Sequence, residues 1–321
     1  MTKKVLITDR FAQDSFLSLQ QHNPFEVMRA DHPQHLPLEH LVSANALIIR
    51  SRTPINEELL KKARQLQVII TCTSGFDHID FHATEKWGIT VMNTPTANIE
   101  SAAQLTWGLV LSCVNNLPQA HKMVKAGDWK RDLITGFELH GRTYGVVGLG
   151  RIGSRVAELA QAFGMNVVAY DPYAEDKSFE RLKIPRLSYE EILKTADVLS
   201  FHVPKTPETE HMLNRSHFEY IHRGLVLINT SRGSVINEND LCEALGKGWL
   251  HAVGLDVFEK EPLARTSNLL TYPNVILTPH IGANTEEAFF KASQIAANKL
   301  ISFFSDGTTS DTLPPKTAWY R

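Results

Sequence analysis

The sequence predicts an α/β protein built from two doubly wound parallel-sheet domains. Short segments rich in Val, Ile and Leu alternate with helical patterns through most of the 321 residues. This order is typical of parallel sheets with right-handed crossovers. The apolar segments show little polar–apolar alternation, as expected for strands that helices cover on both faces. The chain is also longer than one ordinary hydrophobic core requires, which favours two domains.

Two series of strands and helices are expected. In the first, residues 4–8, 25–29, 46–50, 68–71 and 90–93 are strands, and residues 57–65 and 80–87 have helical spacing. The second series begins at Tyr144. Its expected strands are residues 144–147, 167–170, 198–202, 225–229, 252–256 and 275–278, with a weaker candidate at 184–187.

Two helices are expected where the chain passes between the domains. Asn98 can cap a helix that begins at Ile99 and ends before Pro118. Asn284 can cap another helix that continues to about residue 304. If the chain leaves the first domain at Asn98 and returns at Asn284, the first domain is discontinuous and includes the last helix and tail. Helical spacing alone does not require this topology.

The segment from residue 143 to Asp171 predicts a dinucleotide-binding site. An apolar run leads into a G-x-G-x-x-G pattern at residues 148–153, a helical pattern follows, and a second apolar run ends in Asp171. In such a unit Gly148 permits a tight turn, Gly150 a close approach to the pyrophosphate, and Gly153 close packing of helix on strand. The helix N-terminus attracts the phosphates, and Asp171 can accept hydrogen bonds from both ribose hydroxyls of an adenosine. The strands and the acid carry this prediction, because an isolated glycine pattern is often only a turn.

The composition argues against several other classes of protein. A net charge of −2 offers no basic footprint for nucleic acid or an anionic membrane. Cys72, Cys113 and Cys242 are an odd number without C-x-x-C spacing, so neither a disulfide framework nor a metal site is indicated. The N-terminus has the pattern of a strand rather than a secretory signal, and the longest nearly apolar stretch, residues 105–114, is too short to span a bilayer. We therefore expect a cytoplasmic protein.

Four motifs together resemble the D-isomer-specific 2-hydroxyacid dehydrogenase family: Gly148-Leu-Gly-Arg-Ile-Gly153, Asn229-Thr-Ser-Arg-Gly233, Gly254-Leu-Asp-Val-Phe-Glu-Lys-Glu-Pro262 and Thr278-Pro-His-Ile-Gly-Ala283. The resemblance covers essentially the whole chain. It is strongest to the phosphoglycerate dehydrogenase branch, through residues 49–53, 92–95, 101–103 and 137–141. It implies a Rossmann NAD-binding domain of residues 99–284, inserted in a flavodoxin-like substrate-binding domain of residues 1–98 and 285–321. It also implies a homodimer formed mainly by the nucleotide domains.

The resemblance implies hydride transfer between C2 of a 2-hydroxy acid and NAD, with Arg232, Glu261 and His280 as catalytic residues. Histidine has a pKa suited to a base that takes the hydroxyl proton, and its protonated form can return it to a ketone. Glu261 would bind the far ring nitrogen, and Arg232 would present a planar fork to the substrate carboxylate. Singly, such residues are usually solvated. However, Arg232, Asp256 and His280 all follow predicted parallel strands, where ligands bind in such sheets.

The remaining expected contacts divide between cofactor and substrate. For the cofactor they are Arg151, Ile152, Val203, Pro204, Thr230, Asp256, Gly282 and Ala283. For the substrate, beside Arg232 and His280, they are Arg50, the backbone N–H groups of Ser74 and Gly75, and Arg131 from a partner subunit. Arg50 and the nearby Arg52 both follow a strand and should face the cleft between the domains. Each of these could instead be a surface charge or an ordinary turn.

The resemblance implies a particular reaction, with two departures from the family pattern. Gln104 stands where the family has glutamate, and the longer phosphoglycerate dehydrogenases continue into a regulatory domain that we expect this short chain to lack. The expected reaction is oxidation of 3-phospho-D-glycerate to 3-phosphohydroxypyruvate, the first step of serine biosynthesis. One alternative is a hydroxypyruvate, glyoxylate or other 2-oxoacid reductase. Another is an NAD-sensing, corepressor-like binding protein, which the intact catalytic residues do not exclude.

Overall fold

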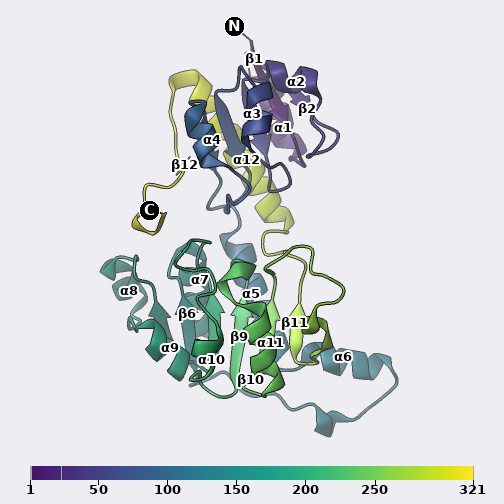
Figure 1. Ribbon diagram of the computed structural model, residues 1–321, viewed down its shortest axis with the longest axis vertical. Coiled ribbons are helices and arrows are strands. Elements are labelled where there is room, and N and C mark those ends of the chain that lie inside the picture. The colour runs from purple at the N-terminus through teal and green to yellow at the C-terminus, as the bar shows by residue number, and fades with distance from the viewer. Residues whose placement is uncertain (1, 23, 321) are drawn as a thin grey trace. The chain divides into compact units, whose positions relative to one another are not determined.

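The chain forms two compact units in the computed structural model, which describes residues 2–22 and 24–320 (Figure 1). Unit 1 contains Met1–Asn98 and Ala283–Arg321, and unit 2 is the continuous segment Ile99–Gly282. The second boundary lies two residues before the position expected from the sequence. Both units are parallel-sheet α/β domains, which confirms the predicted fold class.

Unit 1 contains a six-stranded sheet with the order β12-β5-β4-β3-β1-β2. Its strands are β1 (Lys3–Ile7), β2 (Phe25–Arg29), β3 (Ala46–Ile49), β4 (Val68–Thr71), β5 (Thr90–Asn93) and β12 (Thr312–Leu313). The first five are parallel and have the flavodoxin-like order 2-1-3-4-5. The two-residue strand β12 pairs antiparallel with β5, a pairing that the sequence does not predict.

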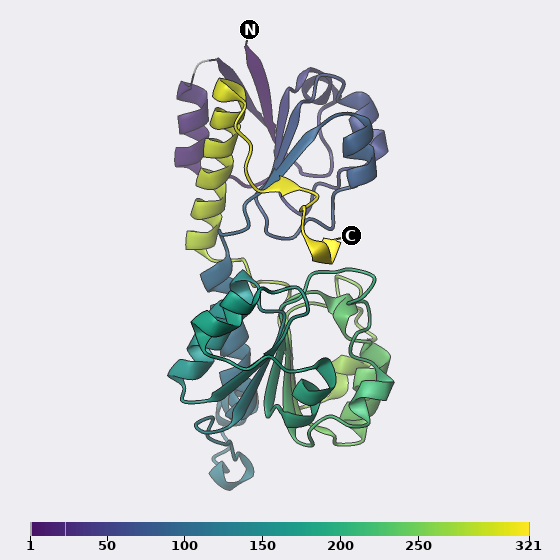
Figure 2. The ribbon, with the colours of Figure 1, turned by 90° about the vertical axis from the view of Figure 1, so that its left-hand side faces the viewer.

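Helices cover both faces of the sheet in unit 1 (Figure 2). The first face packs on α1 (Gln13–Gln21) and α12 (Glu286–Asp306), and the second on α2 (Leu38–Ser43), α3 (Glu57–Lys62) and α4 (Phe81–Lys86). Alternate strand residues enter opposite clusters: Val5 and Ile7 face α1 and α12, whereas Leu6 faces the other helices. Helix α12, near the end of the sequence, therefore completes a hydrophobic core that β1 and α1 begin.

Unit 2 contains a wholly parallel sheet with the order β11-β10-β9-β8-β6-β7. Its strands are β6 (Thr143–Val147), β7 (Asn166–Tyr170), β8 (Val198–Phe201), β9 (Leu225–Asn229), β10 (Leu250–Leu255) and β11 (Val275–Leu277). The weak candidate at residues 184–187 is not a strand. It forms only one parallel bridge, Ala169 to Arg186, because Pro185 has no N–H to extend the ladder. The strand order reverses between β6 and β8, the switch point where ligands bind in such sheets.

The helices of unit 2 form two layers around its sheet. One layer contains α5 (Ile99–Val114), α7 (Arg151–Ala162) and α8 (Asp176–Leu182). The other contains α9 (Tyr189–Thr195), α10 (Arg215–Phe218) and α11 (Glu238–Gly246). The remaining helix, α6 (Leu117–Lys125), has no buried residue. Short 3-10 turns are η1 (Arg131–Leu133), η2 (Gly233–Val235) and η3 (Asn268–Thr271), with η4 (Ala318–Tyr320) in unit 1.

Two helix caps differ from the sequence-based expectation. Within the described residues, the side-chain oxygen of Asn98 has no hydrogen-bond partner and so does not cap α5. Thr285, not Asn284, caps α12, because its Oγ1 accepts a hydrogen bond from the N–H of Ala288 at 3.2 Å. The first connector helix does end before Pro118, but that proline lies in the first turn of α6, where its missing N–H costs nothing.

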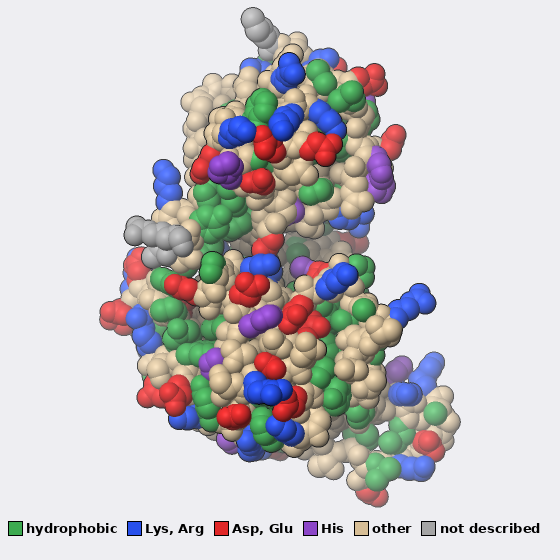
Figure 3. All heavy atoms as spheres, viewed as in Figure 1, with side chains coloured by type: hydrophobic (Ala, Val, Ile, Leu, Met, Phe, Trp, Pro, Cys, Tyr) green, Lys and Arg blue, Asp and Glu red, His purple; other side chains and the backbone are tan. Residues whose placement is uncertain are grey.

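Charged side chains of both signs lie on the surface. Lys and Arg side chains are interspersed with Asp and Glu on the face of each unit seen in Figure 3. Within residues 2–22 and 24–320, no helix is long and apolar enough to cross a membrane, and no group of three or more His, Cys, Asp or Glu residues is placed to hold a metal ion.

Candidate active site

The glycine turn joins β6 to α7 in unit 2. Gly148 has a φ of +94°, and a Cβ there would lie 2.9 Å from the backbone of His202 and from Val203 Cγ1. A Cβ at Gly153 would lie 2.0 Å from the carbonyl oxygen of Gly148. Both glycines are therefore required by the packing of the protein itself. At Gly150, the N-cap of α7, a Cβ would meet nothing within 4 Å, so the space beside this helix N-terminus is open to a ligand.

Asp171 follows β7 and is bound to the glycine turn. Its Oδ2 accepts a hydrogen bond from the N–H of Leu149 at 2.8 Å. Its Oδ1 accepts two more, from Tyr173 at 2.8 Å and Ala174 at 2.9 Å. These bonds fix the carboxylate in one orientation. Because a carboxylate has about four acceptor positions, capacity remains for a ribose hydroxyl. The donor set therefore fits a dinucleotide.

The other expected cofactor contacts of this region surround the glycine turn. Arg151, exposed, and Ile152, half-buried, are the first residues of α7, and the half-buried Val203 and Pro204 follow β8. His202 is a structural residue here, as its place at a strand end suggests. Burial lowers its pKa to about 3, and its Nε2 lies 2.8 Å from Ser200 Oγ.

Asn229, the last residue of β9, and Gly233 position Arg232. Neither is among the site residues predicted from the sequence. Asn229 Oδ1 accepts a hydrogen bond from Ser231 N at 3.0 Å, and its Nδ2 donates to Arg232 O at 2.9 Å. A Cβ at Gly233 would lie 1.8 Å from the carbonyl carbon of Phe258, so the two backbones are in direct contact. Thr230 is fixed separately, with its Oγ1 2.8 Å from that of Thr106. The first and last residues of the Asn229–Gly233 motif are thus structural.

Asp256 organises the loop that carries His280. The side chain is fully buried at 0% exposure. Its Oδ1 accepts hydrogen bonds from Thr278 Oγ1 at 2.6 Å and Ile281 N at 2.8 Å, and its Oδ2 accepts one from Gly282 N at 2.8 Å. A buried carboxylate with this many donors positions its neighbours rather than facing a ligand. The cofactor contact expected of Asp256 stays a prediction.

His280 and Glu261 form the central pair of the site. His280 Nδ1 lies 2.7 Å from Glu261 Oε2, and the two side chains are 50% and 37% exposed. The hydrogen bond that His280 donates to Glu261 raises the pKa of His280 above its ordinary value, although burial and the nearby Arg232 charge act in the opposite direction. Burial is the largest single influence and would raise the pKa of Glu261, but the hydrogen bond and charge of His280, the N–H of Phe258 and the charge of Arg232 together lower it. The pair is therefore a histidine with one nitrogen held by a carboxylate.

Backbone geometry directs both members of this pair. His280 has a φ of +53°, and its N–H donates to Asp256 O at 2.9 Å. A left-handed conformation is unusual for a residue other than glycine and is kept here by the hydrogen bonds of the loop. The loop of Glu261 is fixed by reciprocal bonds, from Glu238 N to Glu259 Oε1 at 2.8 Å and from Glu259 N to Glu238 Oε1 at 2.7 Å.

The expected substrate loop of unit 1 follows β4. Ser74 and Gly75 are half-buried, and among the described residues neither N–H donates a hydrogen bond. The carbonyl groups are bound instead: Asn93 Nδ2 donates to Ser74 O at 2.9 Å, and Thr73 Oγ1 donates to Gly75 O at 2.7 Å. The loop thus presents two free donors with their carbonyls turned inward, an arrangement that suits a carboxylate.

The structure distinguishes Arg50 from Arg52. Arg52 is bound to Asp9 by two hydrogen bonds, one of them from Nε to Oδ2 at 3.0 Å, and this partner raises its pKa. Arg50 follows β3 directly, and its Nη1 is buried without a hydrogen-bond partner in the described chain. Its guanidinium carbon lies 5.5 Å from the ring centre of Phe289. Arg50 is thus the arginine with an unused donor.

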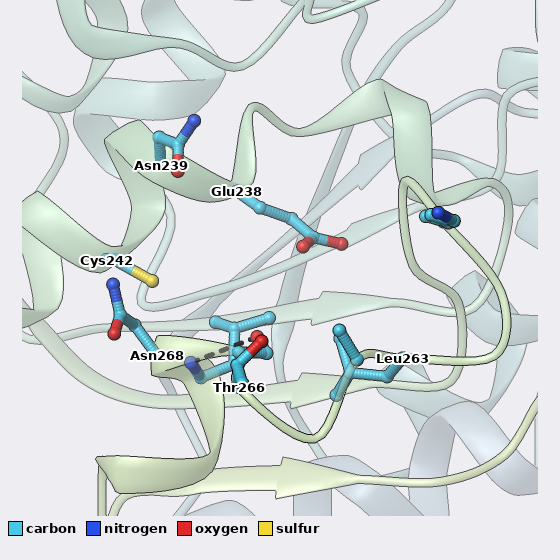
Figure 4. Close-up of a pocket in the computed structure, with 10 residues that line it drawn as sticks. Glu238, Asn239, Cys242, Leu263, Thr266 and Asn268 are labelled. Carbon is cyan, nitrogen blue, oxygen red and sulfur yellow. Dashed lines mark hydrogen bonds between the residues drawn. The ribbon is translucent and has the colours of Figure 1, made fainter.

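Two further features lie outside these clusters. Arg131, in η1, is 87% exposed and pairs only loosely with Asp132, at 3.9 Å. A pocket of about 270 Å³ lies between α11 and residues 260–269, with Glu238 and Cys242 on one side and Leu263 and Thr266 on the other (Figure 4). None of the predicted site residues lines this pocket.

Residues 107–282 match the family described as D-isomer-specific 2-hydroxyacid dehydrogenase, NAD-binding domain. The chain belongs to this family. It is 40% identical to D-3-phosphoglycerate dehydrogenase of Methanocaldococcus jannaschii, over 92% of this chain and 56% of that relative. Glyoxylate reductase of Aeropyrum pernix is 34% identical, over 94% and 92% of the two chains. The D-lactate dehydrogenase of Aquifex aeolicus, solved with NAD and lactic acid, has a TM-score of 0.83 at 33% identity, over 94% and 96%.

The family assignment identifies unit 2 as an NAD-binding domain of these dehydrogenases. The glycine turn and Asp171 are the parts of that domain whose geometry fits the cofactor. The chain spans little more than half the length, 56–57%, of the phosphoglycerate dehydrogenases that it matches.

Proposed function

We propose that this chain catalyses NAD-dependent oxidation of a D-2-hydroxy acid, and that its substrate is 3-phospho-D-glycerate. The observation that carries the dehydrogenase proposal is the His280–Glu261 hydrogen bond of 2.7 Å, with a raised pKa on the histidine. Such a pair can take a proton from a hydroxyl and hold it as imidazolium. The product would be 3-phosphohydroxypyruvate, and the reaction would serve serine biosynthesis.

Three side chains of unit 2 have different roles in this reaction. Nδ1 of His280 is held by Glu261, so Nε2 is the atom that takes the hydroxyl proton. Arg232 binds the substrate carboxylate, which fixes C2 and its hydrogen in one orientation. Bound NAD would accept the hydride as the C2–O bond becomes a carbonyl. A hydride from C2 would go to NAD and the hydroxyl proton to Nε2 of His280, so that two electrons and two protons in all leave the substrate.

The phosphate preference rests on Arg50 and the loop of Ser74 and Gly75. The unused Nη1 of Arg50 supports a role in binding an anion, since a buried donor without a partner costs about 1–3 kcal/mol until a ligand satisfies it. The free N–H groups of Ser74 and Gly75 offer a second anion-binding site. Arg50 and this loop give unit 1 two anion-binding groups, which suits a substrate with both a carboxylate and a phosphate. Arg52, bound to Asp9, is not proposed as a ligand.

A 2-oxoacid reductase is the second candidate, because the glyoxylate reductase relative matches over 92% of its own length. The experiment that separates the candidates compares kcat/KM for 3-phosphoglycerate with NAD against glyoxylate, hydroxypyruvate and pyruvate with NADH. The proposal requires the phosphorylated substrate, or its oxo product in reverse, to be preferred. A preference for glyoxylate would establish the reductase instead, and no turnover of any of them would favour a binding protein.

NAD is expected to be preferred over NADP. Asp171 is held by three backbone N–H groups and cannot turn away from a 2′-phosphate, and Tyr173 and Ala174 add no cation. The mismatch amounts to roughly 1–3 kcal/mol, or about tenfold to a hundredfold in kcat/KM. Steady-state rates with each cofactor measure this ratio. Equal values for the two would contradict the role of Asp171.

We also propose a homodimer formed through α6 and the segment up to η1. Trp129 and Leu133 are 81% and 71% exposed, and Leu117 and Val124 of α6 are exposed beside them in sequence. Large apolar side chains gathered on one segment are typical of a protein interface. Arg131 lies within this segment and would be delivered by it to the partner subunit's substrate.

The dimer is expected to dissociate when this face becomes charged. In a Trp129→Glu, Leu133→Glu double variant, two carboxylates would replace about 150–250 Å² of aromatic surface and a leucine at the interface. Sedimentation at micromolar concentration should give half the mass of the native protein. Leu270→Glu, an exposed leucine elsewhere in unit 2, is the matched control and should stay dimeric. A native protein that sediments as a monomer would refute the interface.

A further inference from the structure

Four aromatic rings form a cluster between the substrate loop and the segment that follows α12. Phe76 belongs to the loop, Phe81 begins α4, and Trp319 and Tyr320 belong to η4. The Phe76 ring centre lies 6.4 Å from that of Trp319 and 5.8 Å from that of Tyr320. Phe81 is 5.6 Å from Phe76 and 5.9 Å from Tyr320. These separations are within the range of stabilising aromatic pairs.

A second connection reaches the same loop through Asn93. Its Nδ2 donates to Ser74 O at 2.9 Å, its N–H donates to Asp311 O at 3.2 Å, and its own O accepts from Lys299 Nζ at 2.7 Å. Lys299 is almost fully buried, and its ammonium group also donates to Asp311 Oδ2 at 2.6 Å and to Ser310 O at 3.0 Å. Residues 310–311 are thereby attached to the residue that holds the loop.

The two donor groups of the loop do not stabilise it. Thr73 Oγ1 lies 2.6 Å from Thr71 Oγ1 and 2.7 Å from Gly75 O, while the N–H groups of Ser74 and Gly75 are unbound in the described structure. A loop that must keep two free donors in place cannot use them to stabilise itself. Its order has to come from neighbours, because ordering it on binding would weaken affinity.

We propose that residues 310–320 act as a positioning element for the substrate loop, with Trp319 and Tyr320 as positioning residues. The strand β12 and Lys299 fix the start of this element at the edge of β5, and Figure 2 shows the yellow segment continuing from β12 to the last turn. Its aromatic end then packs on Phe76, next to the two donors. The inference rests on the proposed role of Ser74 and Gly75 in binding substrate.

The test is the Trp319→Ala variant. Loss of the ring should raise KM for the hydroxy acid about 3- to 30-fold with kcat within about twofold, because the loop binds substrate and transition state alike. The Kd for NAD should not change, because the glycine turn and Asp171 belong to unit 2. Trp319→Phe keeps a ring on Phe76 and should restore KM. Trp87→Ala, an exposed tryptophan of unit 1 outside the cluster, is the matched control.

Hydrogen exchange separates this inference from the proposed function. Amide exchange at Ile79 and Thr94, whose N–H groups donate to the loop carbonyls Phe76 O and Thr73 O, is measured without substrate in the native protein, Trp319→Ala and Trp87→Ala. Faster exchange in Trp319→Ala alone, with a raised KM for whichever hydroxy acid is oxidised, supports the inference. Unchanged exchange or an unchanged KM overturns it. If the native protein oxidises no hydroxy acid, the proposed function fails and the exchange result alone decides whether the loop is held by Trp319.

Discussion

His280→Ala is expected to lower kcat about 10²- to 10⁴-fold, the range typical of a lost general base. The histidine acts on a proton that moves only as the hydride leaves, so its loss affects the transition state rather than the ground state. NAD binding should be nearly unchanged, because the glycine turn and Asp171 lie on other strands. Single-turnover NADH absorbance and NAD titration measure the two quantities separately.

Glu261→Gln is the companion to this variant. The carboxylate raises the pKa of His280, so an amide in its place should lower that pKa toward or below the ordinary value. Oxidation requires neutral His280, and its rate rises as pH increases through this pKa. The acidic limb of the pH–rate profile should therefore move to lower pH in Glu261→Gln, with a smaller loss of kcat than in His280→Ala. A limb that stays in place would exclude His280 as the group that titrates.

Arg50→Ala is expected to reduce kcat/KM for 3-phosphoglycerate about tenfold to a hundredfold. A charge-assisted contact between guanidinium and phosphate contributes roughly 1.5–3 kcal/mol. D-glycerate, which has no phosphate, should lose little. Folding should be hardly affected, because Nη1 of Arg50 makes no hydrogen bond within the described residues. Steady-state kinetics with both substrates and a thermal melt of each variant provide the measurement.

Two other arginines control the interpretation of this result. Arg52→Ala removes the neighbouring guanidinium that is bound to Asp9, and should leave the ratio of the two substrates unchanged. Arg232→Ala should impair both substrates, since both carry the carboxylate. If Arg50→Ala reduces the two substrates equally, Arg50 supports the loop or the carboxylate and the phosphate is bound elsewhere.

Most of the fold could be predicted because its signals are local. The bounds of β2, β4, β5 and β9 agree with the sequence-based expectation. Strands β4, β5 and β9 are rich in Val, Ile, Leu and Thr, and they end at Thr71, Asn93 and Asn229. Features that depend on distant partners could not be predicted. The pairing of β12 with β5 joins two residues to a strand more than two hundred positions earlier. Helix α6 buries no residue, and the sequence analysis predicts no helix there.

The site was predicted through residue types and could not be oriented by them. Histidine, glutamate and arginine in the motifs indicate the chemistry. Which nitrogen of His280 contacts Glu261 depends on the left-handed backbone of His280 and on the loop that Asp256 holds by hydrogen bonds. Likewise, Arg50 and Arg52 are equivalent in sequence. They differ in the structure because Asp9, 43 positions before Arg52, binds Arg52.

The divided first unit has a consequence for synthesis of the chain. Residues 1–98 build a sheet whose face toward α1 is completed by Ala292, Ala296 and Leu300 of α12. That helix is translated only after all of unit 2, a delay of roughly 10–40 s at about 5–20 residues per second. During this interval the nascent sheet has an uncovered apolar face, whereas the continuous nucleotide unit can fold as soon as it emerges. The nascent chain therefore needs either chaperone cover for its first unit or a late, rapid closure by its last helix.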